Sequence, residues 1–457
     1  MHKPYPKYKP SGVEWIGNIP EGWDVRKIKY LGEAVIGLTY SPQDVVNNQE
    51  EGVLVLRSSN IQKGKMDYRD TVYVNKDIPT KLRTRPGDIL ICARNGSVKL
   101  VGKSALIDQR HAGCTFGAFM AILRSKYSEY LNFFIASNVF KAQSGLFSTT
   151  TINQLTNTIL ENTQVSMPVD DKEQQQIANF LDKKTSQIDE LIDKKEKMLK
   201  LLKEKRSAII NHAVTKGLDQ NAKMKPSGID WIGDIPEGWE VKKLKYQIFL
   251  DPPKSEALKK LSIDTFVTFL PMSYVSEDGE IDYSNEKMLE DVYSGYTYFA
   301  DDDVVVAKIT PCFENGKGAL ILKMKNGIGF GTTEFFVLRS NGINKKHLYY
   351  LTISDYFRKI GEACMKGAAG QKRIPDDYIK NFKVCYPGFE QQVDIVSFLD
   401  KKIEEIDNLI GKIIIAIKKL HEYRTAIITA TVTGKIDIRE EKGAMNGRGA
   451  INRARTL

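Results

Sequence analysis

Cysteine and histidine are scarce in this chain, and neither is arranged as metal or disulfide chemistry requires. The five cysteines lie far apart and form no C-x-x-C pair. This pattern argues against a disulfide framework and a thiolate metal site, and it favours a reducing compartment. The five histidines show no metal-ligand spacing, so we expect each to be a surface or packing residue.

Long apolar runs and phosphate-binding loops are also missing. The longest aliphatic cluster, residues 413–417, is too short and too closely flanked by lysine to cross a bilayer. The first twelve residues lack the apolar core of a signal peptide. No G-x-x-x-x-G-K-[ST] loop is present. We therefore expect a cytoplasmic protein that makes no membrane contact.

Each segment that partly matches a catalytic or cofactor-binding motif lacks a residue or element that the motif requires. Asp301–Asp303 is the only dense carboxylate run, and we align Asp302 with Asp88 as a turn residue ahead of a strand. Asp251-Pro-Pro resembles the active-site motif of amino-methyltransferases, but Lys254 replaces the aromatic residue that stacks on a flipped base. The short glycine series at 327–331 is not followed by a dinucleotide-binding helix. The sequence therefore predicts a protein that is not an enzyme.

What the chain does contain is an internal repeat within its 457 residues. Residues 9–31 and 225–247 share 16 identities in 23 positions at an offset of 216 residues. Residues 180–195 and 398–413 form a second matching block at an offset of 218. Two blocks at nearly the same offset indicate a duplication with fixed ends and variable middles.

Short matching segments keep the two halves in alignment within their variable middle parts. Ala93-Arg94 aligns with Ala307-Lys308, and Leu123-Arg124-Ser125 aligns with Leu338-Arg339-Ser340. These alignments predict that the two halves share one fold.

The second repeated block has the pattern of a long helix. In residues 174–213, apolar side chains recur at steps of three, four and seven, and no glycine or proline interrupts them before Gly217. The second copy, residues 391–433, contains one glycine, Gly411. A single helix of this length would expose its apolar stripe, so we expect the two copies to pack antiparallel with one lobe at each end.

The variable middles contain short apolar runs typical of strands, separated by turn residues and by shorter helical stretches. The sequence therefore predicts an α+β fold with two similar lobes. We place the boundaries at 1–170 for the first lobe, 171–216 for the first long helix, 217–224 for a linker, 225–388 for the second lobe, 389–435 for the second long helix and 436–457 for a disordered, Gly/Arg-rich tail.

Positive charge concentrates in the loops of the lobes. The net charge is +10, and residues 81–110 hold seven Lys or Arg against two Asp. Arginine, lysine, asparagine, glutamine and hydroxyl side chains are the groups that contact phosphates and base edges. The candidate DNA-binding residues are Arg57, Ser59, Asn60, Arg94, Asn95, Ser97, Lys99, Thr149, Thr150, Lys308, Thr310, Asn315, Lys317, Gln371, Lys372 and Arg373.

Together, the repeated W-I-G-x-I-P-E-G-W segments, Trp15–Trp23 and Trp231–Trp239, and the repeated F-L-D-K-K helices closely resemble the specificity subunit of type I restriction–modification enzymes. The resemblance covers residues 9 to 437. It implies two target recognition domains joined by two helices that form an antiparallel coiled coil with pseudo-twofold symmetry. Each domain would read one half of a bipartite, asymmetric sequence in double-stranded DNA.

The resemblance also implies the partners. The helices would set the spacer and dock two methyltransferase subunits, and restriction subunits would join through the complex. This chain would hold no cofactor, because S-adenosylmethionine, ATP and Mg²⁺ would bind to the partner subunits. The alternative is a coiled-coil interaction scaffold that does not bind DNA, and a methyltransferase fused into this chain would rest on Asp251-Pro-Pro alone.

Overall fold

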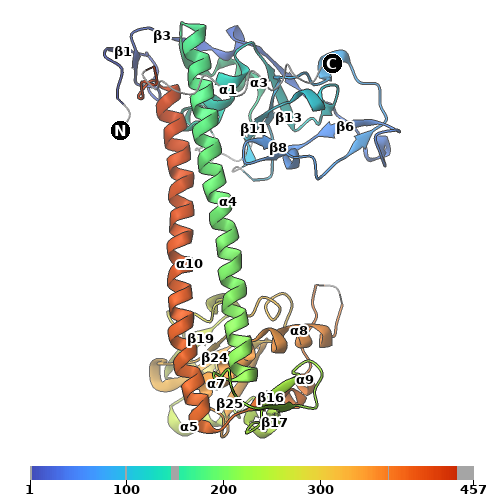
Figure 1. Ribbon diagram of the computed structural model, residues 1–457, viewed down its shortest axis with the longest axis vertical. Coiled ribbons are helices and arrows are strands. Elements are labelled where there is room, and N and C mark those ends of the chain that lie inside the picture. Colours follow the sequence, from blue (N-terminus) through green and yellow to red (C-terminus); the bar gives the residue numbers. More distant parts are fainter. Residues whose placement is uncertain (1–2, 98–99, 146–153, 369, 440–457) are drawn as a thin grey trace. The chain divides into compact units, whose positions relative to one another are not determined.

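The computed structural model describes residues 3–97, 100–145, 154–368 and 370–439 (Figure 1). The chain forms two compact units, of which unit 1 comprises residues 1–196 and 414–457 and unit 2 comprises residues 197–413. We call residues 3–170 lobe 1 and residues 217–388 lobe 2. Each unit therefore combines one lobe with parts of both long helices, α4 (Asp171–Lys216) and α10 (Phe389–Val432).

Two four-stranded sheets form the centre of lobe 1. The first has the order β11 (Ser104–Leu106), β10 (Ile89–Cys92), β13 (Met120–Arg124) and β4 (Glu33–Ile36), all antiparallel. The second has the order β12 (Thr115–Phe116), β6 (Val53–Leu56), β9 (Tyr73–Val74) and β5 (Val45–Val46), in which β12 and β6 are parallel. Strand β10 is buried along its whole length, as its apolar sequence predicts.

Lobe 2 repeats the first sheet of lobe 1 and has a second sheet with a different strand order. Its first sheet has the order β18 (Ile248–Leu250), β25 (Phe335–Ser340), β22 (Val304–Ala307) and β23 (Gly318–Leu320). Its second has the order β20 (Glu286–Met288), β19 (Phe266–Leu270), β24 (Ile328–Gly331) and β21 (Thr297–Ala300), again with one parallel pair, β19 with β24. The predicted α+β class with two similar lobes is confirmed.

Smaller elements complete each lobe. In lobe 1 they are β1 (Tyr8–Pro10), β2 (Asn18–Pro20), β3 (Trp23–Lys27), β7 (Ile61–Gln62), β8 (Lys65–Met66), β14 (Gln164–Pro168), α1 (Ser128–Ile135), α2 (Asn138–Gln143) and α3 (Asn157–Asn162). In lobe 2 they are β15 (Met224–Pro226), β16 (Asp234–Pro236), β17 (Glu240–Lys243), β26 (Lys383–Tyr386), α5 (Ser255–Lys260), α6 (Leu289–Tyr293), α7 (Lys345–Ile353), α8 (Asp355–Cys364) and α9 (Asp376–Asn381).

The repeated helical blocks form the two long helices, α4 (Asp171–Lys216) and α10 (Phe389–Val432). Gly217 ends α4 in the left-handed conformation that glycine favours, with a φ of 77°. The predicted apolar stripe is buried at Ile177, Leu181, Ile188 and Ile192, and it is only half-buried further along α4. None of the helices in the described ranges is long and apolar enough to cross a membrane.

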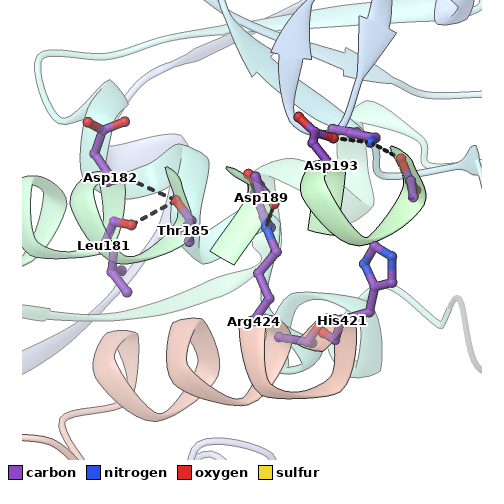
Figure 2. A network of polar contacts seen from close by, with 10 residues as sticks. Leu181, Asp182, Thr185, Asp189, Asp193, His421 and Arg424 are labelled. Atoms are coloured by element: carbon purple, nitrogen blue, oxygen red, sulfur yellow. Dashed lines mark hydrogen bonds and ion pairs between the residues drawn. The ribbon is translucent and has the colours of Figure 1, made fainter. Parts of the chain in front are cut away.

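Within unit 1 the two helices run antiparallel. Arg424 Nε donates to Asp189 Oδ1 at 2.8 Å (Figure 2), while the carbonyl of Val432, at the end of α10, accepts from Ser166 Oγ, just ahead of α4, at 2.7 Å. Residues nearer the end of α10 therefore contact residues nearer the start of α4, as in an antiparallel pair.

Unit 2 contains the equivalent pair. Arg206 Nε donates to Asp407 Oδ1 at 3.1 Å, and Ile210 of α4 shares a core with Leu399 of α10. Arg206 and Asp407 are the repeat counterparts of Arg424 and Asp189 at an offset of 218 residues. The arginine of each copy thus binds the aspartate of the other, once in each unit.

A hairpin of lobe 1 is attached to α4. Lys63 and Gly64 both have positive φ values, 52° and 75°, as a two-residue turn between β7 and β8 requires. Lys63 Nζ donates to Asp193 Oδ1 at 2.7 Å and to Glu196 Oε2 at 3.0 Å. This hairpin follows one of the candidate DNA-binding loops directly, so the contact holds that loop beside the helix.

A buried ion pair fixes the central sheet of each lobe. Asp88 is 3% exposed and accepts from Arg124 Nε at 3.1 Å. Asp303 is 1% exposed and accepts from Arg339 Nε at 2.7 Å. The structure therefore corrects the sequence alignment, because the counterpart of Asp88 is Asp303 and not Asp302.

The corrected register predicts which aspartate lobe 2 depends on. Asp303→Asn should lower the free energy of unfolding of unit 2 by about 2 kcal/mol, since Arg339 loses its buried carboxylate and keeps only its ion pair with Glu256. Asp302→Asn, beside it, is the matched control. Its carboxylate forms an ion pair with Lys345, and the Asp302 side chain is 56% exposed. We therefore expect the free energy of unfolding to change by less than about 0.5 kcal/mol. Urea unfolding followed by circular dichroism measures both, and equal losses would contradict the assignment.

His347 is fully buried in α7, and neither ring nitrogen has a hydrogen-bond partner among the described residues. Burial lowers its pKa to about 4. The unfolded chain, with a pKa near 6.5, therefore binds more protons than the folded chain between about pH 6.5 and pH 4. Stability contributed by neutral His347 is complete above this window and is lost as the pH falls through it.

Unit 2 should accordingly lose about 2 kcal/mol of unfolding free energy from His347 between pH 7 and pH 5. His347→Leu should remove this part of the pH dependence, because no imidazole remains to be protonated on unfolding. His212→Asn, at an exposed position of α4, should leave it intact. Urea midpoints at the two pH values test this, and an undiminished pH dependence in His347→Leu would refute it.

Candidate nucleic-acid interface

The candidate loops of lobe 1 lie together. The turn after β6, η3 (Ser58–Asn60), meets the loop after β10 through Asn95 Nδ2, which donates to Ser58 Oγ at 3.2 Å. Gln154 pairs with Arg94 as an isolated bridge, so a third segment reaches the same place. Three segments that are distant in the sequence therefore converge. Lys99, Thr149 and Thr150 lie outside the described residues.

Asn60 does not fit a direct contact with DNA. It is 0% exposed, and its side chain is used inside the loop: Oδ1 accepts from the Arg57 amide at 2.8 Å, and Nδ2 donates to the carbonyls of Asp67 and Asp70 at 2.9 and 2.7 Å. The amide therefore shapes the loop that carries Arg57, and the interpretation of Asn60 as a contact residue is corrected.

The other candidate residues of lobe 1 differ in exposure and in whether their side chains already have partners within the lobe. Arg57 is committed to Asp70, with Nη2 2.8 Å from Oδ1. Ser59 Oγ is buried and has no hydrogen-bond partner in the described part of the chain. Arg94 and Ser97 are exposed. The Arg94 guanidinium lies 5.3 Å from the ring centre of Phe119, a residue that the sequence analysis missed.

The candidate loops of lobe 2 also converge. The segment after β22 meets the segment before α9 where Thr310 N and Thr310 Oγ1 donate to the carbonyl of Lys372 at 3.0 and 3.3 Å. Asn315 Nδ2 donates to Glu277 Oε1 at 2.8 Å, and Lys317 Nζ donates to the carbonyl of Met272 at 3.1 Å. These contacts add η8 (Met272–Tyr274), which follows β19 as η3 follows β6.

The charged candidates of lobe 2 are mostly paired. Arg373 binds both carboxylate oxygens of Glu334, with Nη2 2.7 Å from Oε1 and Nε 3.0 Å from Oε2. Lys308 Nζ lies 3.9 Å from Asp251 Oδ2 and 4.4 Å from the ring centre of Phe336. Gln371 and Lys372 are exposed.

Asp251 has a structural contact of its own. Its Oδ1 accepts from the Val337 amide at 2.8 Å, and burial raises its pKa. Asp251 thus ties the chain after β18 to β25 beside Lys308. This arrangement gives the Asp251-Pro-Pro segment a role in folding and provides no support for a methyltransferase site. Among the described residues, no group of three or more His, Cys, Asp or Glu side chains could hold a metal ion.

The structure shifts the alignment of the two sites by one residue. The Lys308 amide donates to the carbonyl of Glu334 at 2.7 Å, and the Ala93 amide donates to the carbonyl of Phe119 at 2.9 Å. Lys308 is therefore the counterpart of Ala93, and the predicted equivalence of Lys308 with Arg94 is wrong. The same bonds make Glu334 the counterpart of Phe119.

Comparison with known proteins agrees with this doubled architecture. The family model for the type I restriction modification DNA specificity domain matches residues 20–201 and again residues 236–419. The chain belongs to this family. The predicted resemblance is therefore confirmed at the level of the family.

Curated relatives and solved structures are similar to the chain. The EcoAI specificity subunit of Escherichia coli is 34% identical over 214 residues, which is 45% of this chain and 35% of that protein. The match thus spans about a third of that relative's length. The StySPI specificity subunit of Salmonella potsdam is 25% identical over 431 residues, covering 92% of this chain and 90% of that protein.

The solved structure comes from work on complex assembly and conformational transition of the type I restriction–modification system. It matches with a TM-score of 0.67 at 14% identity and covers 92% of this chain and 99% of its own. At this level of identity the match shows a shared fold.

Proposed function

We propose that this chain is the DNA-reading specificity subunit of a type I restriction–modification complex. The observation that carries the proposal is the double match: a DNA specificity domain is found once in each lobe-and-helix repeat. In each lobe, three polar segments converge at the candidate site. Convergent Arg, Lys, Asn and Thr side chains are the groups that recognise base edges and phosphates.

The two half-sequences should differ. The candidate site of lobe 1 places an exposed arginine on an aromatic ring, whereas that of lobe 2 places an arginine on a carboxylate. Different donors and acceptors at corresponding positions read different bases. The proposed target is therefore a bipartite, asymmetric sequence in double-stranded DNA.

The long helices would set the spacer and dock two methyltransferase subunits. Exposed apolar side chains on them, such as Leu201 at 64% and Ile415 at 56%, are suited to a protein partner. Catalysis, with S-adenosylmethionine, ATP and Mg²⁺, would belong to the methyltransferase and restriction subunits, and this chain would be a non-catalytic cytoplasmic component.

The proposal can be tested by selection from a random duplex library at several salt concentrations. We expect the full-length chain, alone or with its methyltransferase subunit, to enrich two different half-sequences separated by a fixed spacer. Affinity should fall with salt by a slope of about −0.9 per neutralised phosphate, because counterions are released on binding. A flat salt response with no enriched sequence would favour the coiled-coil scaffold instead.

Helix length should set the spacer. Deleting residues 197–203 of α4 together with 410–416 of α10 removes one heptad from each helix between the two Arg–Asp pairs. Each helix shortens by about 10 Å, so we expect a spacer about three base pairs shorter with both half-sequences unchanged. Replacing the same residues by heptads of equal length and apolar pattern is the control. Altered half-sequences with an unaltered spacer would refute the proposed ruler.

A further inference from the structure

Phe119 combines a structural backbone with a free side chain. Its carbonyl accepts from the amides of Ala93 and Arg94 at 2.9 and 3.0 Å, which fixes the start of the loop after β10. Its ring is 60% exposed, although neighbouring Met120 is buried. The backbone bonds do not require an aromatic side chain at this position.

The ring contacts Arg94, the one candidate arginine without a carboxylate partner among the described residues. The Arg94 guanidinium lies 5.3 Å from the ring centre of Phe119 and forms no ion pair within the described residues. Arg57 and Arg373, by contrast, bind Asp70 and Glu334.

This difference decides what each arginine can offer to a ligand. A carboxylate occupies N–H donors of the guanidinium, whereas an aromatic face attracts and orients its plane while leaving the donors free. A phosphate can be bound by the point charge of a lysine as well as by an arginine. A flat, oriented guanidinium with free donors matches the paired acceptors O6 and N7 of guanine.

We propose that Phe119 is a specificity-determining positioning residue, which holds Arg94 to read a guanine in the half-sequence bound by lobe 1. This inference rests on the proposed function. At the corresponding position of lobe 2, Glu334 binds Arg373, so that arginine reads no guanine in this way. Lobe 2 also has Ile309 where lobe 1 has Arg94, so differences at both positions change the base chemistry of the site.

The test measures affinity of the full-length chain for its selected duplex with each guanine replaced in turn by 7-deazaguanine, which lacks the N7 acceptor. For the wild type we expect about a tenfold loss at one guanine in one half-sequence. Arg94→Met should reduce this loss to below about twofold, because no donor remains for N7. Phe119→Leu should reduce it to about threefold, since the guanidinium is no longer oriented.

Two further variants separate positioning from folding. Phe119→Tyr keeps the ring and should restore the tenfold loss. Tyr30→Leu is the matched control, because Tyr30 is 74% exposed in η1 (Ile28–Tyr30), outside the candidate loops, and its ring lies 5.2 Å from Lys29 Nζ. It should behave as the wild type. Unfolding midpoints of all variants should agree.

The outcomes are distinguishable. An undiminished 7-deazaguanine effect in Phe119→Leu, or an equal reduction in Tyr30→Leu, would overturn the role of Phe119. A uniform loss of affinity in Arg94→Met, with the guanine effect kept, would make Arg94 a phosphate contact and overturn the guanine assignment. If the wild-type chain selects no sequence at all, the proposed function fails and this inference fails with it.

Discussion

The fold depends on covering the apolar faces of the two long helices. A helix of this length cannot leave an apolar stripe in water, and the structure covers it from two sides. In unit 1, Ile177 and Leu181 of α4 share one core with Ile428 of α10 and with Trp23 and Phe134 of lobe 1. Each lobe is therefore completed by the start of one long helix and the end of the other.

This constraint joins the two repeats. The core of unit 1 takes residues of the first repeat together with the last turns of the second, and unit 2 takes the reverse combination. The reciprocal Arg–Asp pairs follow the same exchange, since Arg424 binds Asp189 and Arg206 binds Asp407. These residues must keep their spacing in both copies. This requirement explains why the ends of the repeat remain similar while the middles vary.

The sequence was sufficient to predict the architecture, because periodicity and repetition survive without tertiary information. The expected helices at 174–213 and 391–433 match α4 and α10 to within a few residues, and the doubled α+β lobes are as predicted. In the middles, however, the sequence match at Ala93-Arg94 used an offset of 214 residues, whereas the strand pairing gives 215 there. The matching sequence segments aligned Lys308 with Arg94, whereas the backbone hydrogen bonds align Lys308 with Ala93.

The candidate site could be predicted only as a set of loops. Which segments carry it followed from their composition, but the state of each side chain depends on partners far along the chain. Asn60 is buried against the carbonyls of Asp67 and Asp70, and Arg373 is held by a glutamate 39 residues away. Phe119 belonged to no polar motif, and an exposed aromatic residue beside a strand cannot be told from a buried one by sequence alone.

The positions of Phe119 and Glu334 show how a shared scaffold can support different recognition chemistry. In both lobes the residue at this position holds the adjacent loop through its backbone carbonyl, which is independent of the side chain. Neither side chain belongs to the buried core, so exchanging an aromatic ring for a carboxylate costs the fold little. Yet the exchange alters which neighbouring arginine keeps its donors free. Separation of backbone support from side-chain chemistry lets each lobe acquire its own preference while the buried ion pair and the helix contacts stay unchanged.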